Sequence, residues 1–281
     1  MTTTVRAPEL PTAVRDVVDG LAALPGVRSV RIAGSRARGR PTGPDSDWDV
    51  LVYADGVPPR AQLRRLAGAG PGDPFDVETA NGGHPFEETE FSVPASPRID
   101  VCLRPLAHLT QERARAARGA FALYAYPKTA GGVPSYLLLA EAALSAPVAG
   151  DVEAPGCPGV LVDAAVPWWR GRASCALLLA LDHLRAGERV GALEHVLAAA
   201  ASVAHARLIG RGDWYPITKR FLDEAAALPP PARERLAGLS PAGLTEAEVR
   251  GLAGDLGVEV EDGLDWLARG EHLGPGGAGG G

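Results

Sequence analysis

Hydrophobic positions follow two different periods along the chain. Up to about residue 120, apolar residues fall in short runs that alternate with polar ones or are bounded by glycine and proline. The runs at 27–33, 48–53 and 99–103 therefore predict three strands. From residue 133 to residue 269, alanine and leucine recur at intervals near 3.6 residues, which predicts helices almost throughout.

Helices and weaker strands are also expected around these strands. Apolar residues at helical spacing predict a helix from Thr12 to Leu24, and shorter helices are expected at 60–67 and 106–118. Residues 68–97 predict loops with edge strands at 75–79 and 90–93. In the second part, helices are expected at 134–145, 159–186 with a break near Pro167, 189–209, 216–228, 231–237, 245–256 and 261–269.

These patterns predict an α+β protein of two domains. A small mixed sheet flanked by helices forms the first domain, and an all-α helical bundle forms the second. The turn at Gly187-Glu188 joins two long helices that we expect to pack antiparallel. The predicted segments are a flexible arm at 1–11, the first domain at 12–120, the helical domain at 121–270 and a flexible glycine-rich tail at 271–281.

Composition narrows the class of protein. The 28 basic and 34 acidic residues give a net charge of −6, which disfavours a nucleic acid partner because that binding needs surplus basic contacts. The cysteines, Cys102, Cys157 and Cys175, form no CxxC pair, so neither a zinc site nor a disulfide framework is expected. No signal peptide or membrane-spanning stretch stands out, so we expect a cytoplasmic protein without a membrane partner.

Acidic residues interrupt two of the predicted strands. Asp47 and Asp49 share one face of their strand, because side chains alternate, and Asp100 takes the polar face of the third strand. If the two strands are neighbours, the three carboxylates converge. Their mutual repulsion has no folding benefit, whereas carboxylate oxygens are the ligands that Mg²⁺ or Mn²⁺ prefers. The sequence therefore predicts a metal site on these acids.

A Gly-Ser pair precedes the first two acids. Gly34 and Ser35 come where the first strand ends and a turn or short helix begins, and backbone N–H groups at such a place bind anions. A triphosphate held there lies within reach of metals on Asp47 and Asp49. This combination suits phosphoryl-type transfer, in which catalysis depends on positioning and charge neutralisation.

The order of these motifs resembles the nucleotidyltransferase superfamily of the DNA polymerase beta type. Gly34-Ser35, then Asp47-Trp48-Asp49, then the strand with Asp100 carry the resemblance, which covers about residues 27–105. The helical second part is similar in character to the small-molecule branch, such as kanamycin nucleotidyltransferase, and to minimal nucleotidyltransferases. The segment between Ser35 and Asp47 is somewhat long for this family, and the prolines in it make it stiff.

The resemblance implies a role for each motif. Asp47 and Asp49 bind the metals that hold the triphosphate, and Asp100 binds the catalytic metal and helps deprotonate the acceptor. Gly34 and Ser35 contact phosphate. The implied reaction uses two Mg²⁺ ions, which Mn²⁺ can replace, and transfers a nucleoside monophosphate, with ATP favoured as the donor, while pyrophosphate is released.

Five further residues are candidates, each with a plainer alternative. Arg36 and Arg38 either meet phosphate or are simply solvated. Lys219 is a lysine in a chain that uses arginine almost everywhere, and it either reaches a phosphate or lies on a surface helix. Tyr215 stacks on a base or packs. Glu141 interrupts an apolar helix, so it is either a general base or an exposed helix residue.

The acceptor is open to more than one interpretation. The favoured hypothesis is a nucleotidyltransferase, of the EC 2.7.7 type, acting on a hydroxyl of a small molecule. An aminoglycoside-like acceptor is one candidate, since a cationic compound suits an acidic protein. The alternatives are an adenylyltransferase that modifies a protein partner, as in toxin–antitoxin pairs, and a catalytically silent nucleotide-binding sensor. The oligomeric state is not set by the sequence.

Overall fold

The computed structural model describes residues 8–39, 43, 46–68, 78–79, 89–93, 98–124, 132–216, 222 and 227–269. The fold is mixed α+β and divides into two compact units. One unit combines Met1–Ala114 with Leu138–Gly156, and the other combines Arg115–Leu137 with Cys157–Gly281. The sequence predicted one boundary after residue 120. In the structure the chain instead returns to the first unit, so the two units interleave along the sequence.

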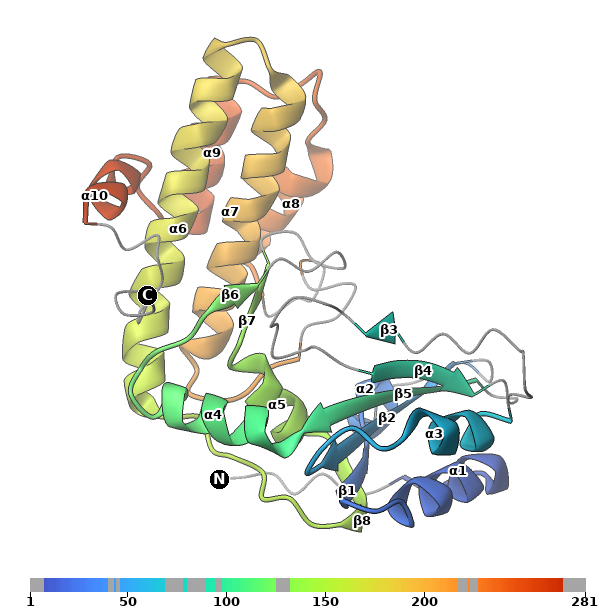
Figure 1. The fold of residues 1–281 in the computed structure, drawn as a ribbon. Helices are drawn as coiled ribbons and strands as arrows, with labels where there is room; N and C mark the ends of the chain where they lie inside the picture. Colours follow the sequence, from blue (N-terminus) through green and yellow to red (C-terminus); the bar gives the residue numbers. More distant parts are fainter. Residues whose placement is uncertain are drawn as a thin grey trace. The chain divides into compact units, whose positions relative to one another are not determined.

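A six-stranded mixed sheet forms the centre of the first unit (Figure 1). Its order is β3-β4-β5-β2-β1-β8, in which β2 and β5 are parallel and the other neighbours are antiparallel. The three strands predicted from the apolar runs are confirmed. The strands are β1 Val27–Ile32, β2 Trp48–Ala54, β3 Glu78–Thr79, β4 Thr89–Val93, β5 Ile99–Pro105 and β8 Ala146–Gly150.

One face of the sheet is apolar and makes the core of this unit. Alternate residues of β1, β2 and β5 point to this face, where α1 (Thr12–Ala22) and α3 (Arg60–Leu66) cover them (Figure 1). A short helix, α2 (Gly34–Ala37), follows β1. The buried side chains of this core include Val14, Leu21, Val30, Ile32, Val50, Val52, Leu63, Ile99, Val101 and Leu103.

The opposite face of the sheet carries polar side chains. Arg31 and Arg104 are each 4% exposed there, and Tyr53 lies fully buried near both of them. Arg31 donates to the Ser145 hydroxyl and carbonyl at 2.9 Å and to the Val152 carbonyl at 3.2 Å. These bonds anchor the returning segment, and they explain why it belongs to the first unit.

The returning segment was partly misassigned from the sequence. The helix predicted over 134–145 is confirmed over most of its length by α5 (Leu137–Leu144), which follows the two-residue strand β7 (Val133–Pro134). The strand β8 after it was not predicted. The edge strand β8 contains Pro147, and its pattern lacks clean alternation. Its pairing with β1, far away in sequence, gives it strand structure that no local pattern could indicate.

Helices make up most of the second unit. The long helices α6 (Gly159–Arg185) and α7 (Arg189–Ile209) pack antiparallel, as predicted (Figure 1). Pro167 lies inside an unbroken α6, so the predicted break there is wrong. The following Trp168 and Trp169 are buried, and Trp169 stacks on His205 of α7, which packs α6 against α7 directly after the proline.

Shorter elements complete the described part of the second unit. The helices α8 (Pro230–Gly238), α9 (Glu246–Leu256) and α10 (Asp262–Ala268) agree with the predicted helices in this region. The strand β6 (Leu123–Tyr124) pairs with β7. The helix α4 (Leu106–Ala116), most of which belongs to the first unit, follows β5 and agrees with the predicted helix there. The helix predicted at 216–228 falls mostly outside the described residues.

A polar aromatic cluster lies in the core of the helical unit. The Trp169 indole N–H donates to the Tyr136 hydroxyl at 3.0 Å, and the Tyr136 and Tyr215 hydroxyls are 2.9 Å apart. The Tyr215 hydroxyl lies 2.7 Å from Nδ1 of His205. Each of these buried polar groups therefore has a partner, which avoids the cost of an unpaired group in the core.

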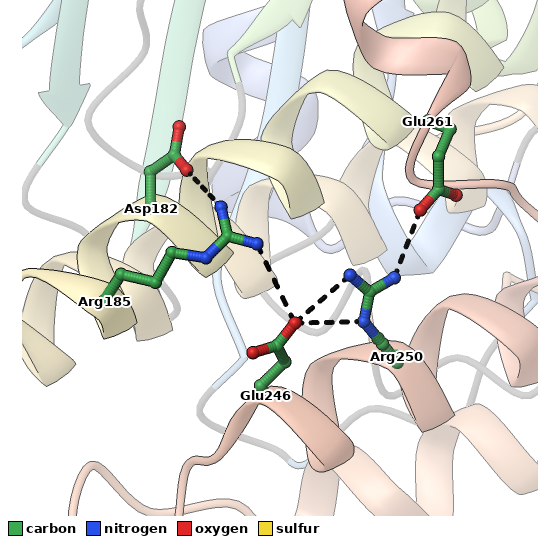
Figure 2. A network of polar contacts seen from close by, with 5 residues as sticks. All are labelled: Asp182, Arg185, Glu246, Arg250 and Glu261. Atoms are coloured by element: carbon green, nitrogen blue, oxygen red, sulfur yellow. Dashed lines mark hydrogen bonds and ion pairs between the residues drawn. The ribbon is translucent and has the colours of Figure 1, made fainter.

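Ion pairs on the surface link α6, α9 and the start of α10 (Figure 2). Arg185 contacts Asp182 at 2.9 Å and Glu246 at 3.8 Å, while Arg250 contacts Glu246 at 3.1 Å and Glu261 at 3.2 Å. All five side chains are at least 46% exposed, so solvent screens the network. Its contribution to stability is therefore small per pair.

One described helix, α7, is long and apolar enough to cross a membrane on length and composition. In the structure, 67% of the apolar 18-residue stretch within this helix is buried inside the protein. This burial is what a central helix of a packed bundle shows.

Candidate active site

Two of the predicted acids face each other across neighbouring strands. Asp49 on β2 and Asp100 on β5 are direct partners in the parallel register. Paired residues of parallel strands point to the same face, and neighbouring strands lie about 4.8 Å apart. Both side chains are therefore on the polar face of the sheet, near the start of their strands, as the sequence predicted.

Gly34 forms a close-fitting surface against Asp49. Its φ of +66° is in the left-handed region, and a Cβ atom built on it would lie 1.8 Å from Oδ2 of Asp49. The preceding Ala33 donates its backbone N–H to the Asp49 carbonyl at 2.8 Å. Only glycine both adopts this backbone conformation without strain and leaves room for the carboxylate. The glycine of the predicted Gly-Ser pair thus directly adjoins the second acid.

Arg36 holds the segment that leads into β2. Its guanidinium donates to the Ser46 carbonyl at 2.5 Å and to the Asp47 carbonyl at 3.3 Å, and it lies 4.4 Å from the centre of the Trp48 ring. The side chain of Asp47 itself is exposed. Arg36 was predicted either to bind nucleotide or to be solvated. Its bonds to the backbone beside Asp47 show that it is not simply solvated, while nucleotide binding stays a prediction.

The other two candidates of this turn, Ser35 and Arg38, lie in and directly after α2. Ser35 is in α2, which is only four residues long, and is partly buried. Arg38 follows directly after α2 and is also partly buried. Both therefore belong to, or directly follow, the short element that contains Gly34.

Asp100 has close partners on the side of β5 that faces away from β2. The Ser92 hydroxyl of β4 donates to its Oδ1 at 2.6 Å, and Nε of Arg98 donates to the same oxygen at 2.8 Å. Nη2 of Arg98 also donates to the Ser92 hydroxyl at 2.9 Å. The Asp100 side chain is 17% exposed and that of Arg98 is 59% exposed. Neither Ser92 nor Arg98 was singled out from the sequence.

The carboxylates of Asp49 and Asp100 consequently lean toward different neighbours. Asp49 adjoins Gly34 after β1, whereas Asp100 adjoins Ser92 on β4, at the opposite side of the β2–β5 pair. Within the described residues, no three His, Cys, Asp or Glu side chains gather closely enough to hold a metal ion as they stand. The donor set and strand register nonetheless suit a hard divalent cation, which carboxylate oxygens bind.

Glu141 forms a structural ion pair in the first unit. Nε and Nη2 of Arg104 donate to its two carboxylate oxygens at 2.8 and 3.0 Å. The side chains of Arg104 and Glu141 are 5% and 33% exposed. Because both oxygens accept from a buried guanidinium, this arrangement favours a structural role for Glu141 over its predicted alternative as general base.

The last two candidates come from the helical unit. Tyr215 is 5% exposed, and its hydroxyl is engaged with Tyr136 and His205. This burial favours the packing alternative over base stacking, and it raises the pKa of the Tyr215 hydroxyl well above its usual value. Lys219 lies outside the described residues.

Comparisons with known proteins do not assign a family to this chain. No family model matches the chain, and no curated protein matches it. Among solved structures, it is similar to a nucleotidyltransferase-like protein from Exiguobacterium sibiricum. The similarity has 14% sequence identity and a TM-score of 0.44, and it covers 92% of this chain and 79% of the other. A likeness this distant does not define the activity, so a functional assignment depends on the residues of the site.

Proposed function

We propose that the protein is a nucleotidyltransferase that needs a divalent cation. In this proposal it transfers a nucleoside monophosphate, AMP from ATP in the favoured case, to a hydroxyl of a small molecule. The observation that carries the proposal is the pairing of Asp49 with Asp100 on adjacent parallel strands, next to a glycine whose lack of a side chain leaves room for the Asp49 carboxylate.

Charge explains why this pairing points to a cation. Asp49 and Asp100 are like charges on neighbouring strands, which lie about 4.8 Å apart, so the two acids repel each other. The apolar side chains that form the core of this unit lie on the other face, so the core does not require acids at these positions. A bound Mg²⁺ would offset the repulsion between the two acids.

Each acid has a proposed role in the transfer. The acceptor oxygen attacks the α-phosphorus, the bond between that phosphorus and the bridging oxygen breaks, and pyrophosphate leaves. Asp47, Asp49 and Asp100 would hold Mg²⁺, which when bound neutralises the charge of the triphosphate. Asp100 would also accept the proton of the acceptor hydroxyl. Gly34 and Ser35 would lie beside the phosphates, and Arg36 keeps the Asp47 backbone in place.

The acidity of the protein favours a cationic acceptor. The net charge of −6 attracts positively charged small molecules and disfavours nucleic acids. An aminoglycoside-like compound, which carries both amines and hydroxyls, fits this preference.

Pyrophosphate release tests the proposal directly. The full chain is incubated with Mg²⁺, each nucleoside triphosphate and a panel of hydroxylated amines. Asp49→Ala and Asp47→Ala are expected to abolish release. Asp55→Ala is the matched control, because Asp55 directly follows β2, is 51% exposed and pairs with Arg28 at the far end of the strand. Release that persists in the Asp49 and Asp47 variants would overturn the assignment.

A nucleotide-binding protein without turnover is a second candidate. The observation that favours it is the engagement of Asp100 by Arg98 and Ser92, which balances the third acid without a cation. Calorimetry separates the two. A silent binding protein takes up ATP with Mg²⁺ but releases no pyrophosphate with any acceptor, whereas an enzyme does both.

A further inference from the structure

We propose that Arg98 is a counter-ion built into the site, which a divalent cation must displace from Asp100 before the acids can act together. This inference rests on the proposed function. It adds a residue to the site and identifies a competition between guanidinium and metal for one carboxylate oxygen.

The contacts define the competition. Oδ1 of Asp100 accepts from the Ser92 hydroxyl at 2.6 Å and from Nε of Arg98 at 2.8 Å. These two donors use the lone pairs through which the same oxygen could bind a cation. The third contact, from Nη2 of Arg98 to the Ser92 hydroxyl at 2.9 Å, closes a ring of three groups around this oxygen.

Burial indicates which member of the ring can leave. The Arg98 side chain is 59% exposed, so its guanidinium can move into water at little cost. The Asp100 side chain is 17% exposed and stays in the sheet beside Asp49. The Arg104–Glu141 pair on the same face could not separate in this way. The Arg104 side chain is 5% exposed, so the loss of Glu141 as a partner would leave a buried charge at a large desolvation cost.

The ring is not needed to pair the strands. Ser92 and Asp100 are already direct partners in the antiparallel β4–β5 register, which runs from Glu90 to Val93. Apolar side chains at Phe91, Val93, Ile99 and Val101 pack on the other face of the same pair. Arg98 therefore adds charge balance at Asp100 rather than strand register.

Manganese binding without nucleotide tests the competition. Free Mn²⁺ is measured by electron paramagnetic resonance during titration of the full chain. Arg98→Gln is expected to bind Mn²⁺ about three- to tenfold more tightly than the wild type, because one charge-assisted competitor is lost. Ser92→Ala, which changes no charge, is expected to tighten binding roughly twofold.

A matched arginine separates competition from general electrostatics. Arg28 of β1 also forms an exposed ion pair in this unit, with Asp55 at 2.6 Å, beside the end of β2 that is far from Asp49. Arg28→Gln removes the same charge and is expected to change Mn²⁺ affinity by less than about twofold. Thermal unfolding of each variant checks that the fold is retained.

The outcomes distinguish this inference from the proposed function. One outcome is that the wild type binds Mn²⁺, Asp49→Ala does not, and Arg98→Gln binds it no more tightly than Arg28→Gln does. This outcome refutes the role of Arg98 and leaves the metal site standing. If Mn²⁺ binds none of the proteins, the metal site itself is refuted, and the displacement of Arg98 with it.

Discussion

Asp49 and Asp100 are direct partners on parallel strands, yet neighbours on opposite sides of the strand pair engage their carboxylates. Asp49 fits against the Cα atom of Gly34, and Asp100 accepts from Ser92 and Arg98. The backbone therefore fixes where the two acids lie, while local contacts fix how each side chain is turned. A ligand that bridges the two acids has to compete with those local contacts. Substitution of the contacting residues should therefore change how well such a ligand binds.

Replacement of Gly34 by alanine should disturb the site through Asp49. The new methyl group would overlap Oδ2 of Asp49, and φ of +66° would strain any residue with a Cβ. We expect Gly34→Ala to lose pyrophosphate release and Mn²⁺ binding, and to lower the free energy of unfolding by about 2 kcal/mol. Urea denaturation and the Mn²⁺ titration measure these effects.

Gly39→Ala is the matched control for that variant. Gly39 has φ of +61°, but none of the described residues comes within 4 Å of the place that a Cβ atom would take. It should suffer a similar backbone strain of about 1 kcal/mol while the site keeps its function. Equal loss of Mn²⁺ binding in both variants would show that strain, and not contact with Asp49, is responsible.

The sequence was sufficient to place Asp49 and Asp100 on one face of the sheet, but it did not indicate the residues that surround them. Strict alternation around Asp49 and Asp100 placed both acids opposite the apolar face, and the observed register confirms that placement. Ser92 and Arg98 were missed because their importance depends on β4 lying beside β5. That pairing joins a weakly patterned segment to a clear strand, so it has no local signal.

The same reason explains the other errors. The buried Arg104 and Arg31 bind residues that lie 37 and 114 positions further along the chain, and arginine in a strand normally predicts exposure. Tyr215 was a candidate for base stacking because an aromatic residue can either stack on a base or pack in a core. Its burial follows from contacts with Tyr136 and His205, which the sequence pattern does not contain.

Glu141 should prove important for stability. Truncation to alanine would leave the guanidinium of Arg104, 5% exposed, without its bidentate partner. We expect Glu141→Ala to lower the free energy of unfolding by about 3 kcal/mol, as measured by urea denaturation. Glu153→Ala is the control, because Glu153 pairs with Arg113 but is 83% exposed, and it should cost less than about 0.5 kcal/mol. A Glu141 variant with full stability but no turnover would instead indicate a general base.

Gly171 should be essential for the attachment of α10 to α6. A Cβ atom at this glycine would lie 2.2 Å from Cδ1 of Trp266, whose ring is buried. We expect Gly171→Ala to destabilise the helical unit by roughly 2 kcal/mol through overpacking. Gly159→Ala, in the same helix and with open space beside it in the described part of the chain, should be neutral or stabilising by about 0.5 kcal/mol. Similar unfolding midpoints for the two variants would contradict the close contact with Trp266.

His205 should make the stability of the helical unit depend on pH. Burial, with a smaller contribution from the nearby charge of Arg172, lowers the pKa of His205 from 6.5 to about 3. As pH falls below about 6.5, the unfolded chain takes up a proton that the folded protein does not, so the free energy of unfolding decreases until pH approaches 3. The loss attributable to this one group is roughly 1.4 kcal/mol per pH unit.

His205→Asn isolates this contribution from that of the other titrating groups. Asparagine does not titrate, and its side-chain oxygen can accept from the Tyr215 hydroxyl in place of Nδ1, which lies 2.7 Å from that hydroxyl. Urea denaturation between pH 6.5 and pH 5 should show the wild type losing about 2 kcal/mol more than the variant. Parallel curves would mean that the folded protein protonates His205 as readily as the unfolded chain does, and hence that the cluster of Tyr136, Trp169 and Tyr215 opens to water in this range.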